Sequence, residues 1–271
     1  MIDKVLSVFL VKELVAFRLL LKGLVVRSLK SSYTGAAGGV AWVYFKPLFM
    51  IFAYYFVFDK VLKVRLGGAG EDVPSYSMFL LSGILPWLVF SESVVEGASC
   101  LVREASLLKK TRFPLELIPA RSVLTSGIKI FPFLFAIWLV AAIFMAGSWT
   151  GFLSLTVWIS IQLLLTYYLV VALSILSAAL RDVGLLVESL FPLLLFFSPV
   201  LYPIEQVPSD LHWLLWLNPF TPLADGYHTI LLQGGLPSIT VFSIVMLWIV
   251  ASLLLCRVLI NRSKEYIVDW L

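Results

Sequence analysis

The sequence predicts an all-α integral membrane protein with six transmembrane helices, and three observations support this fold class. Of the 271 residues, 61% are hydrophobic and only 13% are charged, whereas soluble domains carry about 25% charged residues. The mean hydropathy is +1.01. Six stretches reach the length of about 20 mostly apolar residues that a helix needs to cross a bilayer. Water is therefore not the solvent for most of this chain.

Six spans follow one another along the chain. We place them near Val40–Val61, Ser77–Ala98, Ser126–Ala146, Phe152–Leu180, Gly184–Tyr202 and Pro237–Ile260. Basic residues gather before the first span, between the second and third, and after the sixth, while the opposite connections carry only Lys60, Lys63 and Arg65. Because Lys and Arg are enriched in cytoplasmic loops, we expect a multi-pass protein with both termini in the cytoplasm.

Residues 1–32 are predicted to form an amphipathic helix that lies in the membrane interface. Apolar residues recur there at steps of three and four, which places one stripe on one helical face: Leu6, Leu10, Leu14, Phe17, Leu21 and Leu24. Basic side chains lie away from this stripe, at Lys4, Lys12, Arg18 and Lys22. Such a helix contacts membrane lipids, with its cations toward anionic headgroups. The alternative is a cytosolic helix packed on a partner protein. Residues 33–271 then form the six-span transmembrane domain.

The cytoplasmic connection between the second and third spans, residues 103–116, is long and mixed in charge. It contains Phe113-Pro114, and a residue before proline is pushed away from helical geometry. These properties favour docking to a soluble partner. The residues that we expect to make this contact are Arg103, Glu104, Leu107, Lys109, Lys110, Arg112, Phe113 and Glu116.

The outer segment before the last span, residues 204–233, is rich in aromatic residues and contains no Lys or Arg. It is predicted to form short re-entrant helices that are broken at Asn218-Pro219, because irregular backbone at membrane depth must be buried in protein or line a cavity. The alternative is an interfacial aromatic belt. The residues that mark this segment are Trp213, Trp216, Asn218, Pro219, Phe220 and Tyr227.

Several kinds of chemistry are missing from the sequence. No Gly-x-x-x-x-Gly-Lys-[Ser/Thr] phosphate loop occurs, so we expect that this chain binds no cofactor and that any ATP is hydrolysed by another subunit. Ion-coupled transport is disfavoured, because the ionisable residues near the predicted spans have no evident partner at mid-depth: Lys46, Glu92, Glu96, Lys129 and Glu188. Two solitary cysteines indicate no metal site. The pairs His212 with Asp210 and His228 with Asp225 keep a membrane enzyme as an alternative.

Aromatic residues make up 14% of the chain and are concentrated in the first span. Phe45, Phe49, Phe52 and Phe56 form one stripe, while Tyr44 and Tyr55 fall on a neighbouring face. One face is expected to meet lipid. The other could line a pathway for sugar rings, since aromatic rings offer apolar stacking and Tyr hydroxyls offer hydrogen bonds. The alternative is that all of these rings pack in lipid and between helices.

A set of short motifs occurs in a defined order along the chain. The set comprises Tyr33-Thr34-Gly35 with Trp42 and Pro47, Gly83–Trp87, Leu107–Lys110 with Phe113-Pro114 and Pro119, Arg181-Asp182, Ser198–Pro203, and Leu217-Asn218-Pro219. In this order, from about Arg27 to the C-terminus, the chain resembles the type-2 ABC exporter permeases of the polysaccharide and polyol-phosphate export family. That family includes O-antigen, capsule and teichoic-acid exporters.

The resemblance implies a homodimer in a bacterial inner membrane, with an ABC nucleotide-binding ATPase dimer beneath it and no enzymatic activity in this chain. ATP and Mg would be used by the partner, the cargo would be a lipid-linked glycan such as an O-antigen, and no nucleic acid would bind. Residues 103–116 would be the coupling segment with its coupling helix, and residues 204–233 the outer gate. The channel would be lined by Trp42, Tyr44, Tyr55, Trp87, Phe196, Phe197 and Tyr202. A type-2 exporter of drugs or small lipids and an integral-membrane glycan-modifying enzyme are the alternatives.

Overall fold

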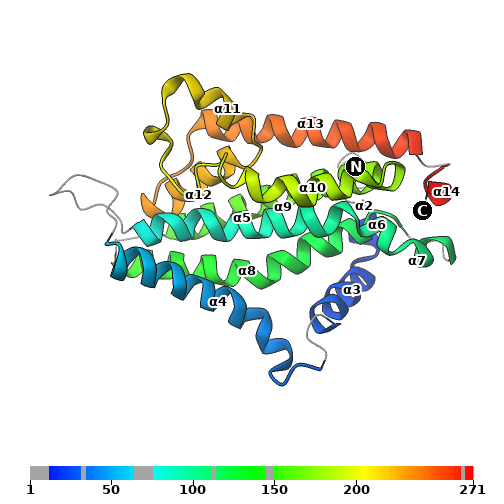
Figure 1. Ribbon diagram of the computed structural model, residues 1–271, viewed down its shortest axis with the longest axis horizontal. Helices are drawn as coiled ribbons and strands as arrows, with labels where there is room; N and C mark the ends of the chain where they lie inside the picture. The colour runs from blue at the N-terminus through cyan, green and yellow to red at the C-terminus, as the bar shows by residue number, and fades with distance from the viewer. Residues whose placement is uncertain are drawn as a thin grey trace.

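The computed structural model describes residues 12–31, 35–63, 76–110, 114–144, 149–263 and 266–270, and these contain helices and turns but no strand. The all-α prediction is confirmed. Within these described ranges four helices are long and apolar enough to cross a membrane, and they run roughly along the long axis of the molecule (Figure 1). They are α5 (Tyr76–Ala98), α8 (Leu117–Phe144), α9 (Trp149–Ala179) and α13 (Ile239–Ser263).

The first and fifth predicted spans have a different form. Helix α4 (Trp42–Tyr55) runs directly into a π-helical segment, η2 (Phe56–Val61). Helix α10 (Asp182–Leu194) has only 13 residues, or about 20 Å at 1.5 Å per residue. After it the backbone tightens, because the N–H groups of Phe196, Phe197 and Ser198 each bond to the carbonyl three residues earlier. Among the described residues, four helices are therefore candidate spans, and the six spans that the sequence predicts are not confirmed.

Helix α5 lies at the centre of the bundle and packs against α8, α9, α10 and α12 (Thr221–Leu232). In an apolar 18-residue stretch of each helix, 72% of α5 is buried inside the protein, compared with 33% of α13. A helix that is apolar all round is stable either in a protein core or in lipid. Helix α5 is thus a core helix, whereas most of α13 is not buried inside this chain.

The short elements gather at the two ends of the bundle (Figure 1). One end carries α6 (Cys100–Arg103), α7 (Ala105–Lys110) and α14 (Ile267–Trp270). The other end carries α11 and α12, and the residues before α12 form η3 (Ile204–Gln206), η4 (Ser209–Leu211) and α11 (His212–Trp216). The predicted docking segment and the predicted outer segment therefore lie at opposite ends of the long helices.

The described part of the N-terminal region forms α2 (Lys12–Ala16) and α3 (Arg18–Ser31). Residues 1–11 and 32 of the predicted interfacial helix lie outside the described residues. Leu14, Leu21 and Leu24 of the predicted apolar stripe pack against the helical bundle, while Leu19 is 79% exposed. Part of the stripe thus contacts protein where we expected acyl chains, because α3 lies against α8.

Candidate functional site

Ion pairs hold the segment between α5 and α8 against the ends of these helices. Arg121 of α8 binds the Glu104 carboxylate at 2.7 Å, and Arg103 donates to the Glu96 carbonyl and lies 4.0 Å from its carboxylate. Leu108 of α7 is buried in the core. The turn between α6 and α7 is therefore held to the ends of both long helices.

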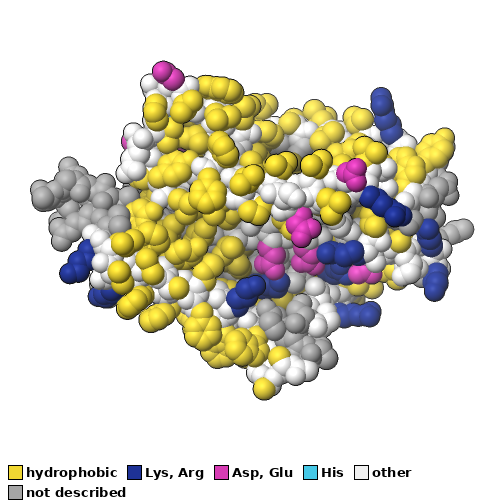
Figure 2. Space-filling view, in the orientation of Figure 1, with side chains coloured by type: hydrophobic (Ala, Val, Ile, Leu, Met, Phe, Trp, Pro, Cys, Tyr) yellow, Lys and Arg dark blue, Asp and Glu magenta, His cyan; other side chains and the backbone are white. Residues whose placement is uncertain are grey.

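The other residues of the predicted docking segment differ in how exposed they are. Lys109 and Lys110 are exposed on α7, whereas Leu107 and Glu116 are half-buried. Arg112 and Phe113 lie outside the described residues. Figure 2 shows most charged side chains of the visible face between its middle and the end that carries α7, next to a broad hydrophobic surface. The described part of the segment thus offers two free cations at one end of the bundle.

The predicted channel aromatics do not form one surface. Six of them lie fully or partly at the surface: Trp42, Tyr44 and Tyr55 on α4, and Phe196, Phe197 and Tyr202 after α10. Trp87 is different, because it is 3% exposed and packs between Phe191 and Phe220 with ring centroids 6.2 and 5.0 Å away. In this structure Trp87 is a core residue of α5.

Asn218 ties the outer segment to the end of α10. It is 5% exposed. Its amide donates to Ser198 Oγ at 2.7 Å, and its Oδ1 accepts from the Phe220 N–H at 3.0 Å. An Asn that bonds to the backbone two residues on is typical of a turn, so the sequence signal Asn218-Pro219 marks the break between α11 and α12 correctly.

The other predicted gate residues lie at different depths. Phe220 and Tyr227 are fully buried, Trp213 is 63% exposed, and Trp216 and Pro219 are partly buried. The outer segment is thus a packed element with a few aromatic side chains at its surface.

Buried hydrogen bonds fasten α12 to α9 and α5. The Tyr227 hydroxyl donates to Gln162 Oε1 at 2.5 Å, and Gln162 Nε2 donates to the Pro86 carbonyl at 2.8 Å. Trp158 Nε1 donates to the Leu223 carbonyl at 3.0 Å. Buried polar groups that are all paired make a helix contact specific. The sequence analysis missed Gln162, although a Gln inside a long apolar helix signals a buried partner.

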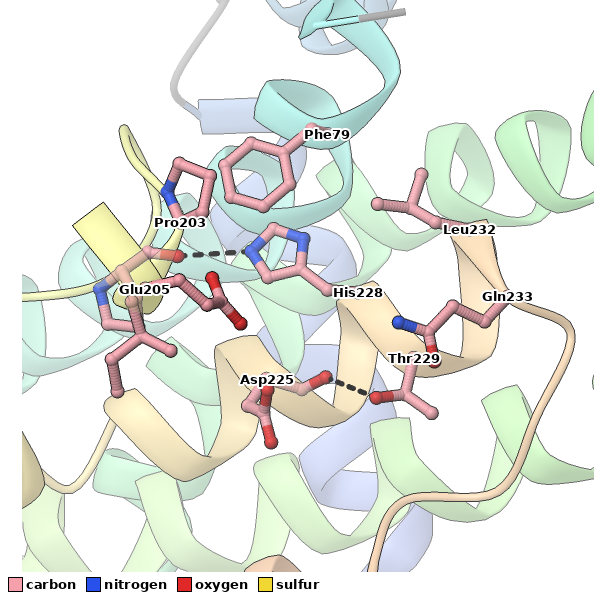
Figure 3. A pocket seen from close by; sticks show the side chains of 10 residues that line it. Phe79, Pro203, Glu205, Asp225, His228, Thr229, Leu232 and Gln233 are labelled. Carbon is pink, nitrogen blue, oxygen red and sulfur yellow. Dashed lines mark hydrogen bonds between the residues drawn. The ribbon is translucent and has the colours of Figure 1, made fainter. Parts of the chain in front are cut away.

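A cavity of about 230 Å³ opens beside α12 at the same end. Figure 3 shows the His228 ring lying flat against Phe79 on its wall, with Glu205 and Asp225 nearby. The two ring centroids are 4.1 Å apart. His228 Nε2 lies 3.1 Å from the Pro199 carbonyl, and Nδ1 lies 2.8 Å from Ser82 Oγ. Because a carbonyl only accepts hydrogen bonds, we assign a proton to Nε2.

Burial shifts the pKa values of the two titratable side chains His228 and Asp225 on this wall. Helix α12 lies outside the four long spans, and burial lowers the pKa of His228 to about 4. Burial, followed by the nearby Glu205 carboxylate, raises the pKa of Asp225. His212 also binds a carbonyl, that of Val207, at 2.9 Å. Among the described residues no cluster of three His, Cys, Asp or Glu side chains could hold a metal ion. The imidazoles of His212 and His228 thus both lie within hydrogen-bond distance of main-chain carbonyls.

An ion pair joins α5 and α8 where the sequence analysis expected no partner. Lys129 Nζ lies 2.5 Å from Glu92 Oε1, and Arg103 lies 4.0 Å from the Glu96 carboxylate. Three of the five residues without an evident partner in the sequence therefore have one in the structure. Lys129 is the only charged residue between positions 126 and 180. Since a charge in an apolar helix needs a counter-ion, the two acids of the preceding span, Glu92 and Glu96, were the candidates that could have pointed to the pair.

These observations define a helical membrane protein with a basic, ion-paired segment at one end and a packed aromatic segment at the other. Residues 20–232 match the model of the family described as ABC-2 type transporter, and the chain belongs to this family. The resemblance inferred from the ordered motifs is confirmed.

Relatives of known name agree with this family. The chain is 31% identical over 255 residues to the O-antigen export system permease protein RfbA of Myxococcus xanthus, which covers 90% of this chain and 94% of that protein. It is 26% identical over 214 residues to a Klebsiella pneumoniae protein of the same name, covering 78% and 79%. It is 21% identical over 210 residues to the polysialic acid transport protein KpsM of Escherichia coli, covering 75% and 78%.

Proposed function

We propose that this chain is the membrane-spanning permease subunit of an ATP-driven exporter that moves a lipid-linked polysaccharide of the O-antigen type across the bacterial inner membrane. The observation that carries the proposal is the similarity to an O-antigen export permease along 90% of the chain. The four long apolar helices support a membrane location. The absence of a phosphate-loop motif from the sequence supports ATP hydrolysis in a separate subunit.

In this proposal α4 with η2 and α10 complete a set of six membrane segments, so that both termini lie in the cytoplasm. Two copies of the chain form the transporter, and an ABC ATPase dimer that uses ATP and Mg docks on them. Helix α7 is the coupling helix, since it exposes Lys109 and Lys110 at the end that carries the basic connections. Helices α2 and α3 lie in the cytoplasmic interface.

Coupling across the membrane would follow a contiguous set of contacts. Movement of the ATPase pushes α7, and the pair of Arg121 with Glu104 passes the push to α8. Helix α5 packs on α8, and the bonds from Pro86 through Gln162 to Tyr227 join α5 to α12. Such a chain of packed helices and hydrogen bonds is a physical route for coupling. The exposed aromatics of α4 and of the turns after α10 then contact the sugars.

Co-purification with the ATPase tests the docking role. The double substitution Lys109→Glu with Lys110→Glu should abolish co-purification, because it reverses two exposed charges on α7. Lys60→Glu with Lys63→Glu makes the same charge change on exposed residues at the other end of the bundle and should leave co-purification intact. Equal recovery of the ATPase with both variants would remove α7 from the proposal.

The cargo is tested separately in cells. Deletion of the gene should leave lipid-linked glycan at the cytoplasmic face of the inner membrane and none at the cell surface. Normal surface polysaccharide in the deletion strain would instead favour an exporter of drugs or small lipids. ATPase activity of the purified chain alone would contradict the assignment as a transport subunit.

A further inference from the structure

The cavity of about 230 Å³ beside α12 is bounded by three parts of the chain. Its walls come from the first turns of α5, from the turns after α10 together with η3, and from the last turns of α12 with the residue that follows it. In Figure 3 Glu205 lies on one side of the cavity and Gln233 on the other, with Asp225 and Thr229 between them. Sites for drug-sized ligands measure about 300–1,000 Å³, so this cavity has room for one small ring.

Two carboxylates line this cavity without a counter-ion. Glu205 is exposed and Asp225 is half-buried, and the described lining contains no Lys or Arg. In the described part of the chain neither carboxylate belongs to an ion pair or accepts a hydrogen bond. Burial, followed by Glu205, raises the pKa of Asp225, as is expected of a carboxylate that loses water and gains no donor. A ligand that donates hydrogen bonds would supply what both carboxylates lack.

The other polar groups of the lining disfavour a metal ion as this ligand. Calcium takes about 6–8 oxygen ligands, whereas the described residues offer no cluster of three His, Cys, Asp or Glu side chains that could hold a metal. Gln233 exposes an amide that both donates and accepts. Thr229 Oγ1 donates to the Asp225 carbonyl at 3.0 Å and keeps the capacity to accept a bond. These groups match a ligand with several hydroxyl groups.

The apolar lining adds a second requirement. Phe79 is covered on one ring face by His228, with ring centroids 4.1 Å apart, and it lines the cavity together with Pro203 and Leu232. An aromatic ring and aliphatic side chains pack against C–H groups. A sugar ring combines both properties, because its hydroxyls donate to carboxylates and its C–H groups pack against apolar side chains.

We propose that this cavity binds one sugar ring, with Glu205 and Asp225 accepting hydrogen bonds from its hydroxyls and Gln233 completing the polar contacts. Bonds from hydroxyls to carboxylates belong to the strong, charge-assisted class. That the ring belongs to an exported glycan rests on the proposed function. Because α12 carries Asp225 and α5 carries Phe79, a movement of α12 against α5 would change the affinity of the site and release the ring.

Equilibrium binding of simple sugars to the purified full-length chain tests the proposal. The probes are the methyl glycosides of mannose, galactose, glucose and N-acetylglucosamine, titrated by saturation-transfer difference NMR in a zwitterionic detergent without a sugar headgroup. At least one probe should bind, and Asp225→Ala should raise its Kd about tenfold, the effect of losing one charge-assisted contact. Asp210→Ala is the matched control, because Asp210 is an exposed carboxylate of the same outer segment that does not line the cavity. It should change Kd less than about twofold.

A second variant separates a lost contact from a folding defect. Glu205 is exposed on η3, so Glu205→Ala should leave Tm unchanged and still raise Kd about tenfold. Failure of all four glycosides to bind, or equal Kd values for Asp225→Ala, Glu205→Ala and Asp210→Ala, would overturn the proposal. Binding of Ca²⁺ without binding of any glycoside would assign the cavity to a cation and also overturn it.

The outcome is independent of the test of transport. Sugar binding is measured on the chain alone, without the ATPase. Sugar binding together with normal surface polysaccharide in the deletion strain would retain the site and refute the exporter, whereas loss of surface polysaccharide without sugar binding would do the reverse.

Discussion

Substitution of Gly226 by Ala should disrupt the packing of α12 against α9 and destabilise the protein. A Cβ atom at Gly226 would lie 2.2 Å from Cζ2 of Trp158, and Trp158 is only 2% exposed. The indole must shift, and it would lose its 3.0 Å hydrogen bond to the Leu223 carbonyl. Overpacking costs about 1–3 kcal/mol and a buried donor without a partner costs about 1–3 kcal/mol, so the free energy of unfolding should fall by about 2–6 kcal/mol.

Thermal unfolding of the full-length chain in detergent, followed by tryptophan fluorescence, measures this effect. A loss of this size should lower Tm by at least about 4 °C in a chain of this length. Gly235→Ala is the control, because its Cβ would lie at an ordinary 3.5 Å from Thr229 Cγ2. In a Trp158→Phe background the smaller ring leaves room, so Gly226→Ala should cost less there. The reasoning fails if Gly226→Ala and Gly235→Ala unfold at the same temperature.

Two further predictions concern α12. Tyr227→Phe leaves the buried Gln162 Oε1 without its donor and should lower the free energy of unfolding by about 1–3 kcal/mol, whereas Tyr202→Phe at the surface should have a smaller effect; equal thermal shifts would count against the buried bond. Burial lowers the pKa of His228 to about 4, compared with about 6.5 in an unfolded chain. Between these values only the unfolded state takes up the proton, so stability should fall as the pH drops from about 6.5 to 4 and this residue should add no further loss below. His228→Asn should flatten that part of the stability curve, and a curve parallel to the wild type would contradict the assignment.

The long apolar helices could be predicted from the sequence because hydropathy and length decide them. The second, fourth and sixth predicted spans end within three residues of α5, α9 and α13. The start of the third span was placed nine residues too late, since Arg121 interrupts the apolar pattern while its partner Glu104 allows the helix to begin at Leu117. An ion pair between segments is invisible to a hydropathy pattern.

The candidate site was predictable only in outline. Composition distinguished the segments 103–116 and 204–233, whose roles stay predictions, and turn chemistry predicted the break at Asn218. The placement of Trp87 in the core, the bond between Gln162 and Tyr227 and the pair of Lys129 with Glu92 depend on which helices lie side by side. Helical periodicity gives the face of a residue but not the neighbour of that face.

The short helix α10 has a consequence for the surrounding lipid. Its 13 residues reach about 20 Å, while the hydrocarbon core is about 30 Å thick. If α10 spans the bilayer as proposed, either the lipids beside it compress or other protein covers it, since a hydrophobic segment shorter than the bilayer is accommodated by local thinning or by association with other protein. A thinner bilayer shortens the apolar distance that a polar chain has to cross. Membrane thickness next to α10 thereby becomes a physical variable of transport, and lipids of longer acyl chain should slow it.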